Sequence, residues 1–330
     1  MSPRDHLDEP VIRAVSRERQ RVPELKALFA LLLLASAAGI VAPASAASVA
    51  VILSDKVDDY QEALRGFKEV ARYTVVAEHN LAGDVDRGRK ILTELETKAK
   101  PDLIFAVGVW ALHAAISQPT NVPVVYAMVL NPPSVVGTAG RNVTGASMNV
   151  PVDQSIRLLK QLGPQVKRIG VVFNRARTGY LVRRAEIIAR DEGLQLVARE
   201  IASPREAVAA LESLQDGIDA LWILPDETTL AQAVVQQMLL FSYRKKVPLL
   251  GLSERHAQMG ALLSLSFASS EDIGRQAGEL AQAILNGKTA AEVPYTTARK
   301  VNLTVNLKAA RKLGVEVPKA VLAKATSVIE

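Results

Sequence analysis

Residues 102–130 read DLIFAVGVWALHAAISQPTNVPVVYAMVL, and this stretch decides the fold. A short apolar run at 102–107 is followed by a helix-like segment at 109–117 and by a second apolar run at 122–130. Neither run alternates between polar and apolar residues, so the sheet that they form must be covered by helices on both faces. The stretch therefore predicts a βαβ unit within a parallel sheet.

The same alternation of short apolar runs and longer amphipathic runs continues on both sides of this unit. Before it, we expect strands at 48–54 and 73–78 and helices at 60–71 and 85–98, the second helix capped by Asp84. After it, we expect strands at 168–173, 194–200, 220–224, 248–252 and 301–305, and helices at 151–162, 179–192, 204–214, 229–244, 270–285 and 307–313. The tail is expected to be helical. The pattern predicts two α/β units of similar size.

Two stretches break this pattern, at 132–148 and 260–267, and we expect the chain to pass between the two units there. The predicted fold class is α/β, with two doubly wound parallel-sheet lobes joined by a hinge. The hinge is expected within 141–150 and 262–267, with Gly145 as its pivot. The expected boundaries are 47–145 for the first lobe, to which about 268–300 returns, and 146–267 for the second lobe, with part of 301–330.

The N-terminal segment has the layout of a secretory signal peptide. Residues 27–46 read ALFALLLLASAAGIVAPASA, an apolar core with basic residues before it and the small residues ASA at 44–46. The core is about a dozen residues long, whereas roughly 20 are needed to span a bilayer as a helix. We predict a signal peptide at 1–46 and a periplasmic mature protein that begins near Ala47. The alternative is an uncleaved membrane anchor.

The composition excludes several classes of site. The chain has no cysteine, which excludes disulfides, thiol catalysis, thiolate metal sites and an acylated lipoprotein cysteine. Its formal charge of +6 is spread over separate stretches and aromatic residues make up only 4% of it, so no nucleic-acid partner is expected. The motifs H-E-x-x-H, G-x-S-x-G and G-x-x-x-x-G-K-[ST] are absent. We expect no enzymatic activity, no cofactor and no metal site.

Short stretches along nearly the whole mature chain match one family in order and spacing. They are 100–104 (KPDLI), 122–127 (VPVVYA), 142–147 (NVTGAS), 167–171 (KRIGV), 225–226 (PD), 274–277 (GRQA), 284–287 (ILNG) and 306–310 (NLKAA). Through them the chain resembles the ABC-transporter substrate-binding proteins of the type that includes tryptophan- and tyrosine-binding members. The resemblance implies the type I periplasmic binding protein fold, with three crossings between lobes, the third near Val301. It also implies a ligand in the cleft and an ABC permease as partner; we expect a monomer.

Two positions depart from the family pattern. Asn131 stands where the family often has aspartate before proline, and the segment 269–274 (SSEDIG) lacks the family's tyrosine. Both departures weigh against an aromatic amino acid as ligand. The ligand candidates are small polar solutes such as amino acids.

The ligand site can also be placed from physical principles. In an open parallel sheet, the carboxyl ends of the strands meet helix N-termini, whose free N–H groups and dipole favour an anionic group. Two such edges that face each other form a ligand cleft. The candidate ligand-binding residues are Ser54, Asp55, Gly108, Val109, Trp110 and Asn131 in the first lobe, Ser147 at the crossing, and Asn174, Thr178, Asp226, Glu227 and Ser253 in the second lobe.

Several of these candidates also have a structural interpretation. Ser54 and Thr178 have the residue type and place of helix caps. Asp226 is either a cap or, with Glu227, the partner of a ligand ammonium group. Trp110 either closes over the ligand or lies in a core.

The predicted function is that of a periplasmic solute-binding protein, which captures a small polar ligand in an interlobe cleft and delivers it to an ABC permease. One alternative is a ligand-sensing module of another envelope system, which would have the same fold. A second alternative is a secreted α/β enzyme. Turnover by the purified protein would favour the enzyme, whereas a ligand-dependent rise in Tm without turnover would favour binding.

Overall fold

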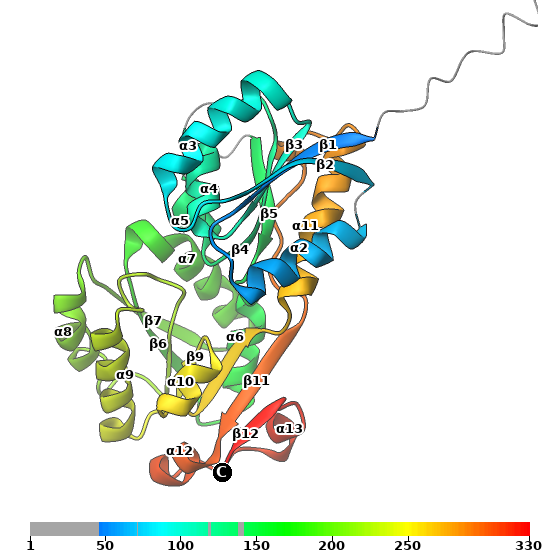
Figure 1. Cartoon of the computed structure of the whole chain (residues 1–330). Coiled ribbons are helices and arrows are strands. Elements are labelled where there is room, and N and C mark those ends of the chain that lie inside the picture. Colours follow the sequence, from blue (N-terminus) through cyan, green and yellow to red (C-terminus); the bar gives the residue numbers. More distant parts are fainter. Residues whose placement is uncertain (1–45, 71, 118–119, 138–141) are drawn as a thin grey trace, which may run out of the picture. The chain divides into compact units, whose positions relative to one another are not determined.

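The computed structural model describes residues 46–70, 72–117, 120–137 and 142–330, which belong to one compact unit, Ala46–Glu330. Apart from Ala46, the predicted signal peptide lies outside the described residues. Within the described part of the chain, no helix has the length and apolar character needed to cross a bilayer. Two β-sheets with helices on their faces organise the unit (Figure 1).

The first sheet has five parallel strands in the order β2-β1-β3-β4-β5. They are β1 (Ala47–Leu53), β2 (Tyr73–Asn80), β3 (Leu103–Val107), β4 (Val124–Val129) and β5 (Val143–Ser147). The helices between them are α2 (Asp58–Val70), α3 (Val85–Glu94), which a π-helical turn at Leu95–Ala99 extends, α4 (Val109–Ile116) and α5 (Pro132–Val136). Asp84 caps α3 by accepting a hydrogen bond from the backbone N–H of Arg87, as predicted.

The apolar run of β3 is buried on both faces. Leu103, Phe105 and Val107 belong to one core, which is covered by α2 and by α11 (Ser270–Leu285). Ile104 and Ala106 belong to a second core, under α3 and α4. Because consecutive strand residues point to opposite faces, an uninterrupted apolar run requires both covers. The predicted doubly wound sheet is confirmed.

The second sheet has seven strands in the order β12-β11-β10-β9-β8-β6-β7, of which only the β10–β11 pairing is antiparallel. They are β6 (Arg168–Phe173), β7 (Gln195–Glu200), β8 (Ala220–Trp222), β9 (Leu249–Gly251), β10 (Leu263–Phe267), β11 (Val301–Asn306) and β12 (Ser327–Ile329). The helices are α6 (Val152–Lys160), α7 (Arg175–Asp191), α8 (Ala207–Glu212), α9 (Gln232–Lys245), α10 (Glu254–Met259), α12 (Leu307–Leu313) and α13 (Lys319–Leu322). The tail is therefore only partly helical, since β12 follows α13.

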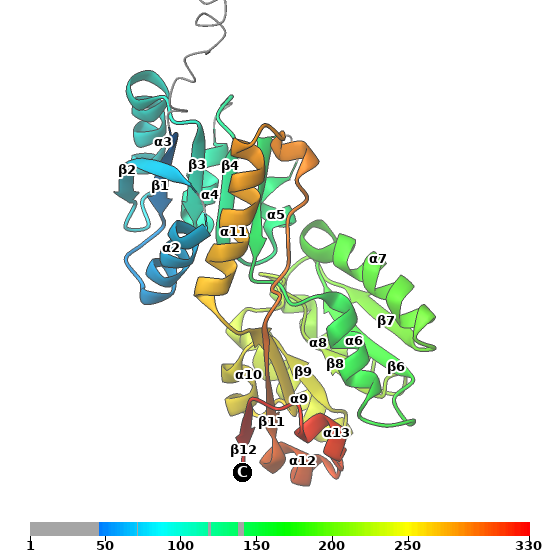
Figure 2. The same ribbon diagram turned by 90° about the vertical axis from the view of Figure 1, so that its right-hand side faces the viewer.

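Helix α11 comes from late in the chain but packs on the first sheet. Figures 1 and 2 both show it beside α2. A Cβ at Gly66 would overlap the carbonyl oxygen of Glu271, and a Cβ at Gly274 would overlap that of Ala63. The two helices therefore touch backbone to backbone, a contact that only glycine permits.

Residues 143–147 form β5 and residues 263–267 form β10, and the chain leaves each sheet directly after these strands. Gly145 lies inside β5, where a Cβ would overlap the carbonyl and ring of Tyr126. It is a packing residue within the sheet rather than a pivot in a loop.

Three segments connect the two sheets, at 148–151, 268–269 and 293–300. The third precedes β11, as the family resemblance implies. The first and third run side by side: the N–H of Ser147 donates to the carbonyl of Thr296 at 2.9 Å, and that of Ala298 donates to Asn149 at 2.9 Å. We call these two the paired crossings.

Candidate ligand-binding site

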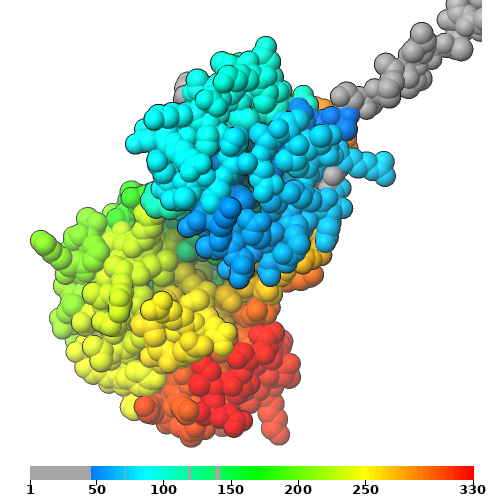
Figure 3. Space-filling model, in the orientation of Figure 1, coloured from blue at the N-terminus to red at the C-terminus, as the bar shows by residue number. Residues whose placement is uncertain are grey.

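The structure places the candidate residues at the carboxyl ends of strands from both sheets or in the first helical turns that follow. Those of the first sheet follow β1, β3 and β4, which are neighbours in that sheet. Those of the second follow β6, β8 and β9, also neighbours. Figure 3 shows the surface recessed between the blue region of α2 and the yellow region of α10. We call the two sets of strand ends the first rim and the second rim.

The first rim contains a tightly packed group formed by Ser54, Gly108 and Tyr60. The Ser54 side chain is buried, and its Oγ accepts the N–H of Ala111 at 2.9 Å, in the first turn of α4. Gly108 has φ of 86°, and a Cβ there would lie 2.6 Å from Ser54 Oγ and 2.7 Å from the Tyr60 ring. Burial, followed by the charges of Asp55 and Asp59, raises the pKa of Tyr60. Ser54 therefore acts as a cap in this structure.

Beside this group the first rim exposes large apolar side chains, next to the exposed charged residues Asp55 and Lys56. The Trp110 side chain is 48% exposed, which excludes its interpretation as a core residue. Val57, after β1, and Leu130, after β4, are 43% and 37% exposed. Large apolar side chains exposed together on neighbouring strand ends are typical of a binding surface.

Asn131 connects the first rim to α7 of the second lobe. It has a left-handed backbone, with φ of 52°, and its N–H donates to Asn149 Oδ1 at 2.9 Å. Its Nδ2 donates to the Arg177 carbonyl at 3.1 Å, and its Oδ1 accepts the Tyr180 hydroxyl at 2.5 Å. Burial raises the pKa of the Tyr180 phenol well above its usual range. Asn149, Arg177 and Tyr180 were not predicted from the sequence, and nothing in their local pattern singles them out.

Asp226 is the centre of the second rim. It is fully buried, and its Oδ2 accepts the backbone N–H of Asn174 at 2.7 Å and the Thr178 hydroxyl at 2.5 Å. Its Oδ1 accepts the N–H of Thr228 at 2.9 Å. The carboxylate thus joins the start of α7 to the loop after β8, and both of its oxygens are occupied by protein donors.

The remaining candidates differ in what they offer. Glu227 is exposed and lies 3.6 Å from Arg177. Ser253 is half-buried, and its side chain does not cap α10. Asp55 is exposed, whereas Ser147 is buried and its Oγ accepts the N–H of Asn149 at 3.2 Å.

Behind the rims lies a small cavity of about 30 Å³, which Leu130, Pro225 and Leu252 line together with Trp222. The Trp222 Nε1–H is buried without a hydrogen-bond partner among the described residues. A cavity of this size is large enough to hold a water molecule. Trp222 thus provides an unused donor next to both rims, which the sequence did not predict because the residue lies within a buried strand.

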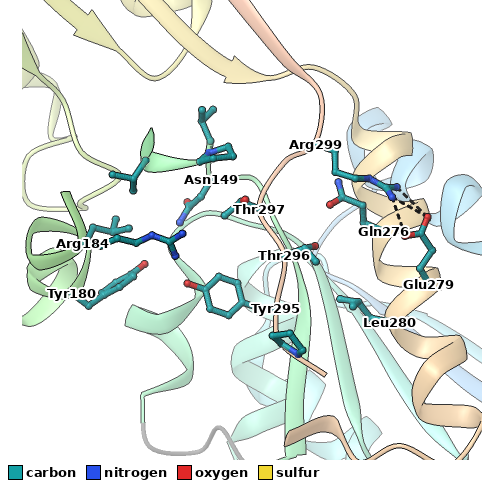
Figure 4. Close-up of a pocket in the computed structure, with 15 residues that line it drawn as sticks. Asn149, Tyr180, Arg184, Gln276, Glu279, Leu280, Tyr295, Thr296, Thr297 and Arg299 are labelled. Carbon is teal, nitrogen blue, oxygen red and sulfur yellow. Dashed lines mark hydrogen bonds and ion pairs between the residues drawn. The ribbon is translucent and has the colours of Figure 1, made fainter. Parts of the chain in front are cut away.

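A second cavity, of about 500 Å³, lies beside the paired crossings (Figure 4). None of the predicted candidates lines it. Among the described residues, no group of three or more His, Asp or Glu side chains is placed to hold a metal ion.

Comparisons with known proteins agree with this architecture. A family model described as "ABC transporter substrate binding protein" matches residues 49–329. A tyrosine-binding protein of Clostridioides difficile is 26% identical over 214 residues, which cover 63% of this chain and 61% of that protein. A conserved domain protein of Vibrio cholerae, solved by crystallography, is 27% identical with a TM-score of 0.59, covering 86% of this chain and 100% of that chain.

A Streptococcus pneumoniae ABC domain, solved in complex with L-Trp, shares the fold. It is 23% identical with a TM-score of 0.58, covering 85% of this chain and 100% of that chain. The family match extends over almost all of the described chain and the fold match over both sheets. The chain therefore belongs to the ABC transporter substrate-binding protein family and has the type I periplasmic binding protein fold.

Proposed function

We propose that this protein is a periplasmic solute-binding protein that captures an amino acid between its two rims and delivers it to an ABC permease. The observation that carries the proposal is the pairing of an exposed apolar rim with a preorganised polar rim, each at the carboxyl edge of its sheet. The family and the tyrosine-binding relative support the ligand class.

In this proposal the first rim holds the ligand side chain. Trp110, Val57 and Leu130 supply apolar area, and the first N–H groups of α4, at Val109 and Trp110, receive the ligand carboxylate. The N–H of Ala111 is not available, because Ser54 already accepts it.

The second rim holds the ligand ammonium group. We assign that contact to Glu227 and Ser253, which are accessible, and give Asp226, Asn174 and Thr178 the role of holding the loop in place. Asn131 is likewise assigned to the contact with α7, since its polar groups are occupied. On this assignment, its departure from the family's aspartate does not bear on the ligand.

Export and transport are tested separately from binding. The proposed periplasmic location rests on the predicted signal peptide, and cell fractionation with N-terminal sequencing tests it directly. Association with a permease, measured as ligand uptake lost on deleting the gene, separates transport from sensing.

The binding experiment is a thermal-shift and calorimetric screen of the purified protein against the standard L-amino acids. We expect at least one saturable 1:1 complex, which raises Tm because the ligand binds only the folded state. A flat response to the whole panel would overturn the proposed ligand class, and turnover of a bound compound would favour the enzyme alternative.

A further inference from the structure

Away from the paired crossings, the loop after β4 contacts helix α7 of the second lobe. Figures 1 and 2 both show α5, which follows this loop, beside α7, and among the described residues this is the most extensive helix contact between the lobes. Asn131, in the loop, is only 4% exposed. Because water is excluded from this contact, the hydrogen bonds within it are stronger than those on the surface.

The Asn131 amide makes two hydrogen bonds across the boundary between the lobes. Its Nδ2 donates to the Arg177 carbonyl at 3.1 Å, and its Oδ1 accepts the Tyr180 hydroxyl at 2.5 Å. Burial raises the pKa of the Tyr180 phenol well above its usual range, so the hydroxyl keeps its proton at neutral pH and can donate it. Both ends of the amide are thus engaged by one helix of the other lobe.

The Asn131 backbone is held in place as well. It is left-handed, with φ of 52°, a conformation that asparagine tolerates. Its N–H donates to Asn149 Oδ1 at 2.9 Å, and its carbonyl accepts the Ser134 hydroxyl at 2.8 Å. The Asn149 N–H in turn donates to Ser147 Oγ, at the end of β5, at 3.2 Å. The amide therefore projects toward α7 from a backbone that the first lobe and the crossing fix.

An amide is the side chain that this contact requires. Aspartate, which the family often has at this place, has the same shape and tolerates the same backbone, but an ionised carboxylate only accepts hydrogen bonds. It would keep the Tyr180 contact and would set a negative charge against the Arg177 carbonyl. The departure from the family pattern at Asn131 thus adds a donor that is directed at the second lobe.

The contact reaches the second rim through the first turns of α7. The Thr178 hydroxyl, next in the chain to Arg177, donates to the buried Asp226 at 2.5 Å, and the Asn174 N–H donates to the same carboxylate at 2.7 Å. The start of α7 is therefore tied to the loop after β8. When Asn131 holds α7, it also sets how far the second rim lies from the first.

We propose that Asn131 and Tyr180 form an interlobe latch, which sets the spacing of the two rims. Opening the lobes at this point breaks both hydrogen bonds of the Asn131 amide. The loss of one such bond changes the ratio of latched to open molecules about fivefold. Asn131 is then a positioning residue, which acts on the rims through α7.

The test measures the distance between the lobes in the purified protein without ligand. The chain has no cysteine, so Lys90→Cys on α3 and Glu212→Cys on α8, both exposed, accept one nitroxide label in each lobe for pulsed double electron–electron resonance. Asn131→Asp and Tyr180→Phe each remove one bond, so each should raise the fraction of molecules outside the main distance about fivefold. Asn131→Gly keeps the left-handed backbone but removes both bonds, and should raise that fraction further.

Asn306→Asp is the matched control. Asn306 is also 4% exposed, its Nδ2 donates to the Ala257 carbonyl at 2.7 Å, and its Oδ1 accepts the Ala309 N–H at 2.8 Å, all within the second lobe. Asn306→Asp should lower Tm about as much as Asn131→Asp does, because each variant sets a buried carboxylate against a carbonyl. It should leave the distance between the lobes unchanged.

A second label pair separates a change between the lobes from damage within one of them. Glu212→Cys and Lys308→Cys, on α8 and α12, both lie in the second lobe, and their distance should stay the same in every variant. Unchanged interlobe distances in Asn131→Gly and Tyr180→Phe, or an equal change in Asn306→Asp, would overturn the latch, and so would a change confined to the second pair. No ligand is present in these measurements, so a flat amino acid panel would remove the proposed function and leave the latch standing.

Discussion

The two rims lie at equivalent places, the carboxyl ends of the strands of their sheets, but they differ in the side chains that they present. The first rim leaves Trp110, Val57 and Leu130 partly exposed, whereas the second rim buries Asp226 completely under three protein donors. The first rim therefore leaves apolar surface accessible to a ligand. In the second rim, the Asp226 carboxylate is fully used in hydrogen bonds within the protein. A rigid polar support opposite an adaptable apolar surface is an arrangement that favours preorganised binding.

The strongest way to break this comparison is Asp226→Ala. The variant leaves the N–H groups of Asn174 and Thr228 and the Thr178 hydroxyl without their acceptor, so we expect a loss of about 3 kcal/mol in unfolding free energy. Urea denaturation measures it. Glu227→Ala, at the exposed neighbour, is the control and should change stability by less than about 0.5 kcal/mol. Equal stabilities would mean that the buried carboxylate does not organise the second rim.

Trp110→Ala tests the first rim, where we expect ligand affinity to change and stability to stay the same. Because the side chain is half-exposed, the variant should fold with nearly unchanged stability. Ligand affinity should fall about thirtyfold, equivalent to about 2 kcal/mol, since a large ring is removed from the binding surface. Calorimetry with the identified amino acid measures it, and Leu240→Ala, 62% exposed on α9, is the control. An unchanged Kd would exclude Trp110 from the site.

Tyr180→Phe sharpens the comparison at the point where the first rim meets α7. It removes the hydroxyl that donates to Asn131, at an expected cost of about 1 kcal/mol. Tyr243→Phe removes a hydroxyl that donates to the Gly260 carbonyl within the second lobe, and should cost a similar amount. Only Tyr180→Phe should alter the small-angle scattering profile. Identical profiles would show that the Asn131 contact does not fix the relation between lobes.

The smallest expected effect is a pH dependence confined to the second rim. Burial, followed by the charge of Arg255, lowers the pKa of His256, whose Nδ1 accepts the N–H of Leu252 at 3.1 Å. As the pH falls, the unfolded chain therefore binds a proton at His256 before the folded protein does. The contribution of His256 to the free energy of unfolding is thus present above about pH 6.5 and declines below it.

The stability difference between the protein and His256→Gln should accordingly shrink by less than about 1 kcal/mol from pH 7.5 to pH 5. Denaturation at both pH values measures it. Gln258→Ala, on the same helix, carries no titrating change and serves as control. A stability difference that grows as the pH falls would mean that folding raises the pKa of His256 instead of lowering it.

The sequence was sufficient for the doubly wound sheets because an apolar run such as 103–107 needs cover on both faces whatever follows it. It was insufficient for β5, whose residues VTGAS resemble a loop, whereas the sequence LSLSF of β10 alternates apolar and polar residues as a strand does. Gly145 belongs to β5 through its pairing with Tyr126 of β4, which leaves no room for a Cβ. Tertiary pairing thus overrode local composition at β5.

The rims were predictable in position but not in role. Strand ends are visible in a sequence, so Asp226 and Trp110 could be named. Asp226 accepts hydrogen bonds from Asn174 and Thr178, which lie after β6 and in α7. No spacing in the sequence connects these two residues with Asp226. The cavity beside the crossings was missed for the same reason, since Arg184 and Gln276 come from helices far apart in the chain.

The glycine contact between α2 and α11 also dictates an order of events during folding. Ser270 reaches back to Asp59, 211 positions earlier, so one face of the first sheet stays bare until synthesis has passed α11. Strands β6 to β10 are contiguous, but β11 and β12 complete the second sheet only after α11 has been made. Both halves therefore wait for late-made segments, and the amino-terminal half, whose α2–α11 contact spans more of the chain, has the longer-range requirement.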